Sequence, residues 1–194
     1  MRLFSPKPNI SILKEQLLEV VKTLDAAKIQ YHLEGGTLLG CLRDGDLIPW
    51  DHDADISIMS DDLDRVETVI KNFPKRWKVS LRFFDKDYEF AKKGDLRLIK
   101  IKDRHAYFIS GANTTDIFLK FRHEGKVYWE AAGNIMAVDK RYYDGTEQLS
   151  CLGRQFSTPV DSESYLTDKY GDWQSPVKEW HCSQEKTIVY PKVD

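Results

Sequence analysis

The sequence predicts an α+β protein, of mixed α/β content, in which one mixed β-sheet is flanked by helices. Residues 10–28 repeat apolar side chains with a 3.6-residue period, which is typical of an amphipathic helix. The middle of the chain contains short runs in which apolar and polar residues alternate, which is typical of strands. A length of 194 residues is enough for one domain with a sizeable core. We therefore expect a single domain over residues 1–194.

The chain as far as Pro74 alternates helices with strands. Residues 44–46 (Asp-Gly-Asp) stop a short helix, and Pro49 holds the residue before it in an extended conformation. Ser60 is a suitable N-cap for the helix that Pro74 ends. The expected elements are a helix over 10–28, a strand over 29–34, a helix over 37–43, a loop over 47–50, a strand over 54–59 and a helix over 61–73.

Beyond Pro74 the pattern becomes rich in strands. In one of them, Leu98 and Lys100 fall on one face, while Ile99 and Ile101 fall on the other. Residues 124–125 (Glu-Gly) permit a hairpin between the strands that flank them. The expected strands cover 77–84, 96–102, 106–110, 115–122 and 126–130, and a last helix covers 163–170, stopped by Gly171.

Three aspartates, Asp51, Asp53 and Asp55, occupy alternate positions before an apolar run that ends at Met59. Because a strand places residues i, i+2 and i+4 on one face, a strand here would project all three carboxylates from one side. The carboxylates would repel one another, and a divalent cation such as Mg²⁺ or Mn²⁺, which prefers oxygen ligands, would relieve that repulsion. An acidic turn between two elements is the alternative interpretation.

Gly35, Gly36 and Thr37 lie where the first expected strand gives way to a helix. Glycine lets the backbone approach a ligand closely, and the free N–H groups of a helix N-terminus attract anions. The stretch 33–59 therefore combines an expected phosphate-binding end with an expected metal-binding end. A plain tight turn is the alternative explanation of the two glycines.

The two ends together resemble the LicD/fukutin-related family of phosphotransferases, through G-G-T-L-L-G-x-x-R followed by I-P-W-D-x-D-x-D-I. The run Y-L-x-x-x-Y-G-D-W near the C-terminus also matches that family. The family in turn resembles the nucleotidyltransferase superfamily, in which a third carboxylate follows on a later strand. The resemblance implies a nucleotidyltransferase-like core over about 31–122, with metal-binding carboxylates on adjacent strands, and a C-terminal extension of strands and a helix over about 123–194.

The resemblance also implies which carboxylates act. Asp53 and Asp55 are the expected metal ligands and catalytic residues, with Asp116 as a third ligand or a general base. Asp51 is expected either to bind the metal or to hold a ligand in place. Related proteins carry a D-[IV]-F element that Asp116 matches; without the resemblance, an exposed aspartate at a strand end would be the better interpretation.

The expected substrate contacts are Gly35, Gly36, Thr37, Arg43, Lys100 and Lys102. Arg43 is the arginine of the first motif, and a phosphate-transferring site needs cations to offset phosphate charge. Lys100 and Lys102 lie in I-K-I-K-D-R, which resembles a K-[LI]-R-D strand of the family. Lys102 stands where the family often has arginine, and a lysine is a point charge rather than a planar fork. An exposed strand face is the alternative explanation of the two lysines.

The resemblance implies a metal-dependent phosphotransferase that uses Mg²⁺ or Mn²⁺. The transferred group would be phosphocholine, ribitol phosphate or glycerol phosphate, moved from a CDP-linked alcohol donor to a hydroxyl of a glycan or glycolipid, with release of CMP. One alternative is a nucleotidyltransferase that uses an NTP donor. Another is a non-catalytic module that binds a nucleotide or a glycan.

Net charge, hydrophobic segments and cysteine spacing limit the expected location and binding partners of the protein. The formal net charge of -2 gives no footprint for nucleic acid, and no segment is long and apolar enough for a membrane span. The three cysteines, Cys41, Cys151 and Cys182, are far apart in the sequence and form no C-x-x-C. Their spacing argues against a structural zinc site and fits a reducing compartment. We therefore expect a cytoplasmic protein in which each cysteine is a small buried hydrophobic residue.

Overall fold

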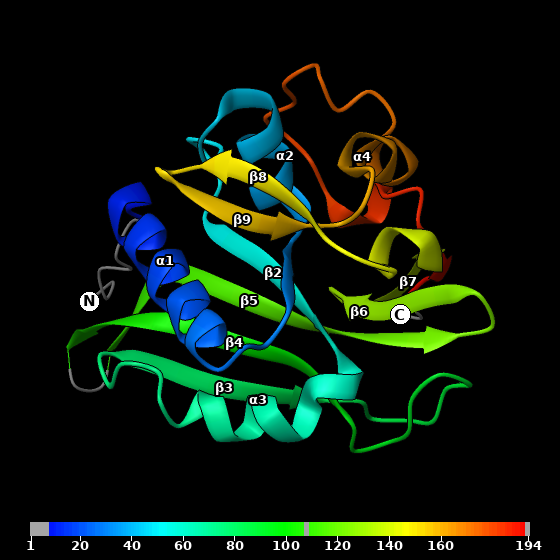
Figure 1. The fold of residues 1–194 in the computed structure, drawn as a ribbon, viewed down its shortest axis with the longest axis horizontal. Coiled ribbons are helices and arrows are strands. Elements are labelled where there is room, and N and C mark those ends of the chain that lie inside the picture. Colours follow the sequence, from blue (N-terminus) through cyan, green and yellow to red (C-terminus); the bar gives the residue numbers. More distant parts are fainter. Residues whose placement is uncertain (1–7, 107–108, 193–194) are drawn as a thin grey trace, which may run out of the picture.

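One mixed sheet of eight strands carries the fold (Figure 1). The computed structural model describes residues 8–106 and 109–192. The sheet contains β1 (Tyr31–Leu33), β2 (Asp53–Met59), β3 (Trp77–Phe83), β4 (Leu96–Ala106), β5 (Ile109–His123), β6 (Lys126–Ala131), β7 (Asn134–Asp139) and β10 (Ile188–Tyr190). A separate hairpin joins β8 (Glu147–Cys151) to β9 (Arg154–Thr158). The helices are α1 (Ile10–Ala26), α2 (Gly35–Asp44), α3 (Leu63–Ile70) and α4 (Ser162–Tyr170), with short 3₁₀ helices η1 (Ser60–Asp62), η2 (Lys140–Tyr143) and η3 (Cys182–Gln184).

The long strand β5 organises the sheet. Its first part pairs in parallel with β2 and in antiparallel with β4, and its end forms an antiparallel hairpin with β6. From there β7 and β10 extend the sheet in one direction, while β3 extends it beyond β4 in another. The sheet therefore joins the N-terminal half of the chain to its C-terminal strands through a single strand.

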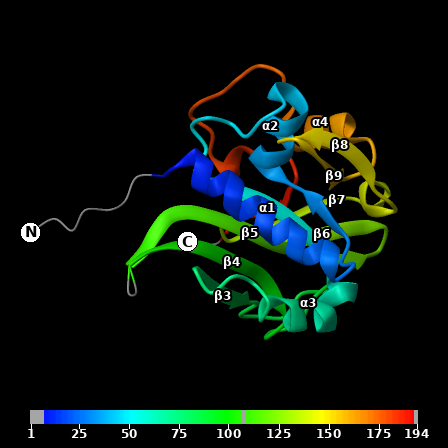
Figure 2. The same ribbon diagram turned by 60° about the vertical axis from the view of Figure 1, so that its left-hand side comes forward.

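The two faces of the sheet differ in chemistry. α1 packs on one face, where Thr115 of β5 donates a hydrogen bond to Gln16 of α1 at 2.9 Å (Figures 1 and 2). Ile117 and its partner Ile56 on β2 are fully buried on that same face. Because successive residues of a strand alternate between faces, Asp116 points to the opposite side, away from α1.

The structure confirms most of the expected elements. α1 begins after Asn9, whose side chain caps the helix by accepting a hydrogen bond from the Ser11 N–H at 2.9 Å. Leu17, Val20 and Leu24 form part of its buried stripe. The hairpin between β5 and β6 also forms as expected, across residues 124–125.

Several boundaries differ from the expectation. β2 begins at Asp53, so Asp51 lies in the preceding turn, and α2 begins at Gly35 rather than near Thr37. The helix expected over 61–73 divides into η1 and α3, which ends at Ile70. Of the strand expected over 106–110, residue 106 ends β4 and residues 109–110 belong to β5, while residues 107–108 lie outside the described residues. Strands were expected in the C-terminal extension, but none was placed at β7, β8, β9 or β10; β7, for example, has five buried residues in succession and so shows no alternation.

A disulfide joins Cys41 of α2 to Cys151 of β8 across 110 residues of sequence, with Cα atoms 5.5 Å apart. The expectation of separate cysteines is wrong for this pair, because the fold brings α2 against the β8–β9 hairpin. Disulfides persist in oxidising compartments, so the expected cytoplasmic location loses the support that it took from the cysteines. Within the described ranges, Cys182 forms no disulfide, and no helix has the length and apolar character needed to cross a membrane.

Reduction of the Cys41–Cys151 bond should lower the free energy of unfolding by about 2–4 kcal/mol, because the bond restricts the unfolded chain. Urea unfolding with and without dithiothreitol measures the change. The variant Cys182→Ser is the matched control and should keep the full response to the reductant. Identical unfolding midpoints with and without dithiothreitol in the wild-type protein would contradict a stabilising role for the bond.

Candidate active site

Three carboxylates meet on the sheet face opposite α1. Asp53, Asp55 and Asp116 each offer an oxygen atom, and these atoms all lie within 4.8 Å of one another. Asp55 of β2 and Asp116 of β5 are direct partners in the parallel register, while Asp53 precedes Asp55 by two positions on the same face. The sequence prediction of carboxylates gathered on adjacent strands is thus confirmed for these three residues.

Burial and nearby carboxylates raise the pKa values of two of these acids, Asp55 and Asp116. Burial, followed by the charges of Asp53, Asp116 and Asp51, raises the pKa of Asp55 well above its usual range. Burial also raises the pKa of Asp116, although Lys100 opposes the rise through a contact of 2.6 Å between its Nζ and Asp116 Oδ2. The other oxygen, Asp116 Oδ1, is buried and has no hydrogen-bond partner in the described part of the chain.

Asp51 lies beside this group and not within it. It sits in the turn before β2, where its Oδ1 accepts a hydrogen bond from the His52 N–H at 2.9 Å. A strand that carries all three aspartates, which was one interpretation of their spacing, is therefore not formed, because Asp51 lies before β2. Burial and the adjacent Asp53 raise the pKa of Asp51 to about 6, so this residue belongs to the same acidic region.

The absence of a side chain at Gly35 and Gly36 leaves space for the carboxylates of Asp55 and Asp51. Gly35 has φ +54°, and a Cβ atom placed there would lie 2.5 Å from Asp55 Oδ2. A Cβ atom on Gly36 would collide with Asp51 Oδ2. Thr37 is buried beneath them, and its Oγ1 accepts a hydrogen bond from the Asp55 N–H at 2.8 Å. The start of α2 is thus fitted directly against the carboxylates, and Thr37 positions Asp55 through its backbone.

Two cavities flank the carboxylates. The larger has a volume of about 480 Å³, and the smaller has a volume of about 270 Å³. Trp50, Trp173 and Trp180 line the larger cavity together with Arg43 and Lys178. The smaller cavity contains Glu34, Gly35, Asp116, Phe118, Trp129 and Lys169. Both cavities share Asp53, Asp55, Tyr170, Cys182 and Glu185.

The three expected cationic residues take different positions. Arg43 lines the larger cavity, but its guanidinium already makes two hydrogen bonds to the Asp44 carboxylate, at 2.9 and 2.7 Å. Lys100 pairs with Asp116 as described above. Lys102 stands two positions further along β4, and its charge lowers the pKa of Asp116 as Lys100 does. Neither lysine lines one of the two cavities.

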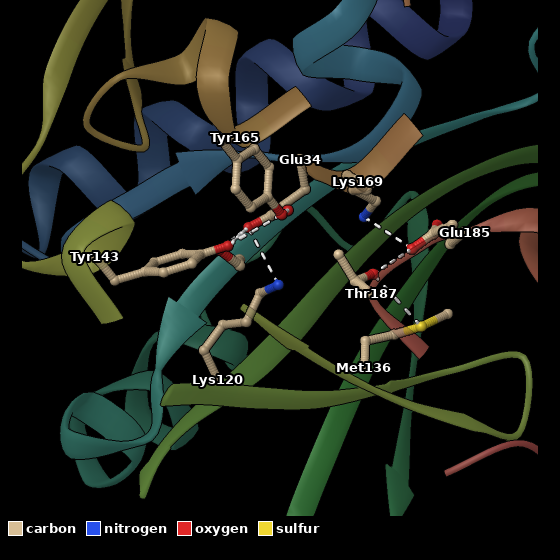
Figure 3. A network of polar contacts seen from close by, with 9 residues as sticks. Glu34, Lys120, Met136, Tyr143, Tyr165, Lys169, Glu185 and Thr187 are labelled. Carbon is tan, nitrogen blue, oxygen red and sulfur yellow. Dashed lines mark hydrogen bonds and ion pairs between the residues drawn. The ribbon is translucent and has the colours of Figure 1, made fainter. Parts of the chain in front are cut away.

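A buried network supports the glycine turn from below (Figure 3). Glu34, which is 2% exposed, accepts hydrogen bonds from Tyr143, from Tyr165 at 2.6 Å and from Ser57 at 2.7 Å, and forms an ion pair with Lys120 at 3.3 Å. Burial alone would raise the pKa of Glu34, but the charge of Lys120 and the other partners outweigh it and lower the pKa to about 2. Burial in turn lowers the pKa of Lys120 to about 7.

A second buried ion pair joins α4 to the C-terminal segment (Figure 3). Lys169 of α4 lies 3.5 Å from Glu185, and both side chains are less than 10% exposed. Glu185 also accepts a hydrogen bond from Thr187 at 3.2 Å, and the Lys186 N–H donates to the Lys169 carbonyl at 3.0 Å. These contacts fix residues 171–187, which supply part of the wall of both cavities.

Sequence reasoning did not identify Glu34, Lys120, Lys169 or Glu185. Two sequence features could have indicated two of these residues. The first is that Lys120 follows Asp116 by four positions, so in a strand the two side chains share a face. The second is Lys169, which falls inside the Y-L-x-x-x-Y-G-D-W run. Nothing local marks Glu185, because its partner comes from a different element.

The variant Glu34→Gln should lower the free energy of unfolding at pH 7 by about 3 kcal/mol, because it removes the counter-charge of the buried Lys120, whose pKa then falls further so that the amine must give up its proton. The pKa of Glu34 is lowered from 4.5 to about 2, so the stability that its charge contributes is present above pH 4.5 and is lost as the pH falls toward 2. The difference between wild type and variant should therefore narrow over that range.

Urea unfolding at a series of pH values measures this difference. Lys140→Met breaks an exposed ion pair with Asp144 and serves as the control, with an expected effect below about 1 kcal/mol. A wild-type advantage that stays constant from pH 5 to pH 3 would contradict the assigned charge on Glu34.

Two solved structures match this chain with TM-scores below 0.5. The lincomycin-bound crystal structure of lincosamide antibiotic adenylyltransferase LnuA gives a TM-score of 0.49 at 13% identity, over 79% of this chain and 84% of that chain. The solution structure of the antibiotic-resistance factor ANT(2″)-Ia gives a TM-score of 0.47 at 12% identity, over 88% of this chain and 80% of that chain.

A family model gives the family, and the sequence relatives match this chain only in part. Ribitol 5-phosphate transferase FKRP of Mus musculus and of Homo sapiens is 44% identical over 66 residues, which is 34% of this chain and 13% of that protein. An uncharacterised protein of Rickettsia prowazekii (strain Madrid E) is 27% identical over 146 residues, which is 75% of this chain and 48% of that protein. The chain thus spans about half or less of these relatives. Residues 28–161 match the family described as LicD/FKTN/FKRP, nucleotidyltransferase domain. The chain belongs to the LicD/FKTN/FKRP family.

Proposed function

We propose that this protein is a metal-dependent phosphotransferase that moves a phosphoalcohol from a CDP-linked donor to a hydroxyl of a glycan or glycolipid and releases CMP. One observation carries the proposal: three carboxylates from β2 and β5 converge between two cavities at the start of α2. Family membership and the partial similarity to ribitol 5-phosphate transferase FKRP support a transferase of this type. The transferred group is phosphocholine, ribitol phosphate or glycerol phosphate.

The acidic residues fit Mg²⁺ or Mn²⁺. Both ions prefer carboxylate oxygens, and Asp53, Asp55 and Asp116 offer three such oxygens within 4.8 Å of one another. The buried and unpartnered Asp116 Oδ1 and the raised pKa of Asp55 are features that a cation would relieve. We assign Asp53 and Asp55 as metal ligands, Asp116 as a third ligand or as the general base, and Asp51 as a further ligand or as the group that holds Asp53.

The remaining residues bind and orient the donor. When bound, the metal supplies positive charge that offsets the charge of the diphosphate and of the departing CMP. The N–H groups of Gly35 and Gly36 lie in the first turn of α2, where a helix has no internal acceptors for them, and we assign them to the phosphates. Arg43 and the lysines Lys100 and Lys102 add positive charge around that site.

The transfer step is a displacement at phosphorus. The acceptor hydroxyl oxygen forms a bond to the phosphorus that carries the alcohol. The bond between that phosphorus and the bridging oxygen breaks, and CMP leaves with the electron pair. The hydroxyl proton passes to Asp116, whose pKa is raised by burial and is therefore suited to accepting a proton.

A thermal-shift panel with Mn²⁺ or Mg²⁺ tests the proposal. CDP-choline, CDP-ribitol and CDP-glycerol should stabilise the protein only when the metal is present, by about 2.7 kcal/mol at a concentration of 100 Kd. A preference for CTP or ATP would indicate a nucleotidyltransferase instead. Stabilisation without CMP release on any glycan acceptor would indicate a non-catalytic binding module.

The variant Asp55→Asn should melt at a higher temperature than wild type without metal, because it removes a charge that burial and the neighbouring acids disfavour. It should also lose the stabilisation by Mn²⁺ and the release of CMP. Asp64→Asn, on the exposed face of α3, is the control and should keep both. A lower melting temperature for Asp55→Asn would mean that the side chain is needed for the fold rather than for the metal.

The variant Gly35→Ala should weaken Mn²⁺ binding at least tenfold, because the added methyl group displaces the Asp55 carboxylate. Gly45→Ala is the matched control: Gly45 also has positive φ, +71°, but no described atom lies within 4 Å of a Cβ placed there. Both variants should lose about 1 kcal/mol of stability through backbone strain. Isothermal titration measures the Mn²⁺ affinity of each variant. Equal affinities in the two variants would show that Gly35 has no role in metal binding.

A further inference from the structure

The two cavities meet at the proposed metal ligands, and this arrangement fits a linear donor. A CDP-linked alcohol carries its diphosphate between the nucleoside and the alcohol. With the diphosphate at Asp53 and Asp55, which line both cavities, the two ends of the donor extend into different cavities. The following argument rests on the proposed function and assigns one end of the donor to each cavity.

The size and the lining residues of the two cavities indicate which end of the donor each one holds. The larger cavity, about 480 Å³, lies in the range of sites for drug-sized ligands and presents Trp50, Trp173 and Trp180 to a planar base. The smaller cavity, about 270 Å³, has room for an alcohol of a few carbons. The nucleoside therefore belongs in the larger cavity, and the alcohol belongs in the smaller one.

One lysine of the lining, Lys169, already lies against the aromatic rings of the smaller cavity. Lys169 Nζ lies 5.1 Å from the centroid of the Trp129 ring, and the fully buried Lys120, which is outside the lining, lies 3.1 Å from the same centroid. Lys169 Nζ is also 5.5 Å from the centroid of the Tyr170 ring. The neighbouring Tyr170 and Glu185 raise the pKa of Lys169 against the effect of burial, so this group remains a cation.

Most of the carboxylates around the smaller cavity already form ion pairs with lysines. Glu34 pairs with Lys120 and Glu185 pairs with Lys169, as Figure 3 shows. Asp116 pairs with Lys100. Among the described acidic residues that line this cavity, only Asp53 and Asp55 form no ion pair with a lysine or arginine, and both face the proposed metal. Recognition of a quaternary ammonium group needs an open aromatic face, and this cavity offers a fixed ammonium group there instead.

We infer that the smaller cavity is the subsite for the transferred alcohol and that Lys169, held over Trp129 by Glu185, makes it accept an uncharged polyol and reject choline. The ammonium of Lys169 donates hydrogen bonds to hydroxyl groups but repels a trimethylammonium group. Lys169 is thus a specificity-determining residue, and it takes no part in bond making or bond breaking.

The test compares CDP-glycerol with CDP-choline by isothermal titration in the presence of Mn²⁺. Wild-type protein should bind CDP-glycerol at least tenfold more tightly than CDP-choline. Lys169→Met keeps the length of the side chain and removes the charge, so the ratio of the two dissociation constants should fall toward one. Because this change leaves Glu185 without its partner, the double variant Lys169→Met/Glu185→Gln is measured beside it.

The control is Lys178→Met, which removes a lysine from the larger cavity and should leave the ratio at its wild-type value. A wild-type preference for CDP-choline, or equal binding of the two donors, would overturn the inference and leave the proposed function in place. An unchanged ratio in both Lys169 variants would remove Lys169 as the determinant. No binding of either donor, with clear binding of CTP, would overturn the proposed function itself.

Discussion

The parallel pairing of β2 with β5 is the constraint on which the site depends. It sets Asp55 directly beside Asp116, and the antiparallel pairing of β4 with β5 sets Lys100 on the other side of Asp116. The backbone hydrogen bonds fix these positions whether the side chains attract or repel each other. Burial at these positions, together with the neighbouring carboxylates, raises the pKa values of Asp55 and Asp116. The fold thus holds like charges together, and a ligand that neutralises them gains affinity from that arrangement.

Glu34 connects this acidic region to the rest of the molecule. Its backbone N–H donates to the Asp55 carbonyl at 2.9 Å, while its side chain reaches Lys120 on β5, Tyr143 on η2 and Tyr165 on α4. Hydrogen bonds are directional, so one buried carboxylate fixes the relative positions of four elements. The residue that follows it is Gly35, which leaves space for Asp55. The carboxylate cluster and the buried network therefore share one turn of backbone.

Local patterns predicted those parts of the fold and site that depend on local sequence. The alternation of Asp53 and Asp55 predicted that their side chains share one face of a strand, and the amphipathic period predicted helix α1. The family resemblance added Asp116 to the carboxylate cluster. The remaining features depend on contacts between distant segments: the Cys41–Cys151 bond spans 110 residues, and the partner of Glu185 lies on α4. Such contacts leave no periodic signal, because each partner carries the ordinary polarity of its own element. β7 was missed for a related reason, since it is buried on both faces.

The wall shared by the two cavities has a consequence for synthesis of the chain. Glu185 reaches its place only when the following strand, β10, has paired with β7, with Ile188 opposite Met136. The carboxylates of β2 and β5 precede this strand in the chain by more than sixty residues. The wall that Glu185 adds to both cavities is therefore the last part of the site to be synthesised, and the site proposed for the donor is complete only when that residue has been added.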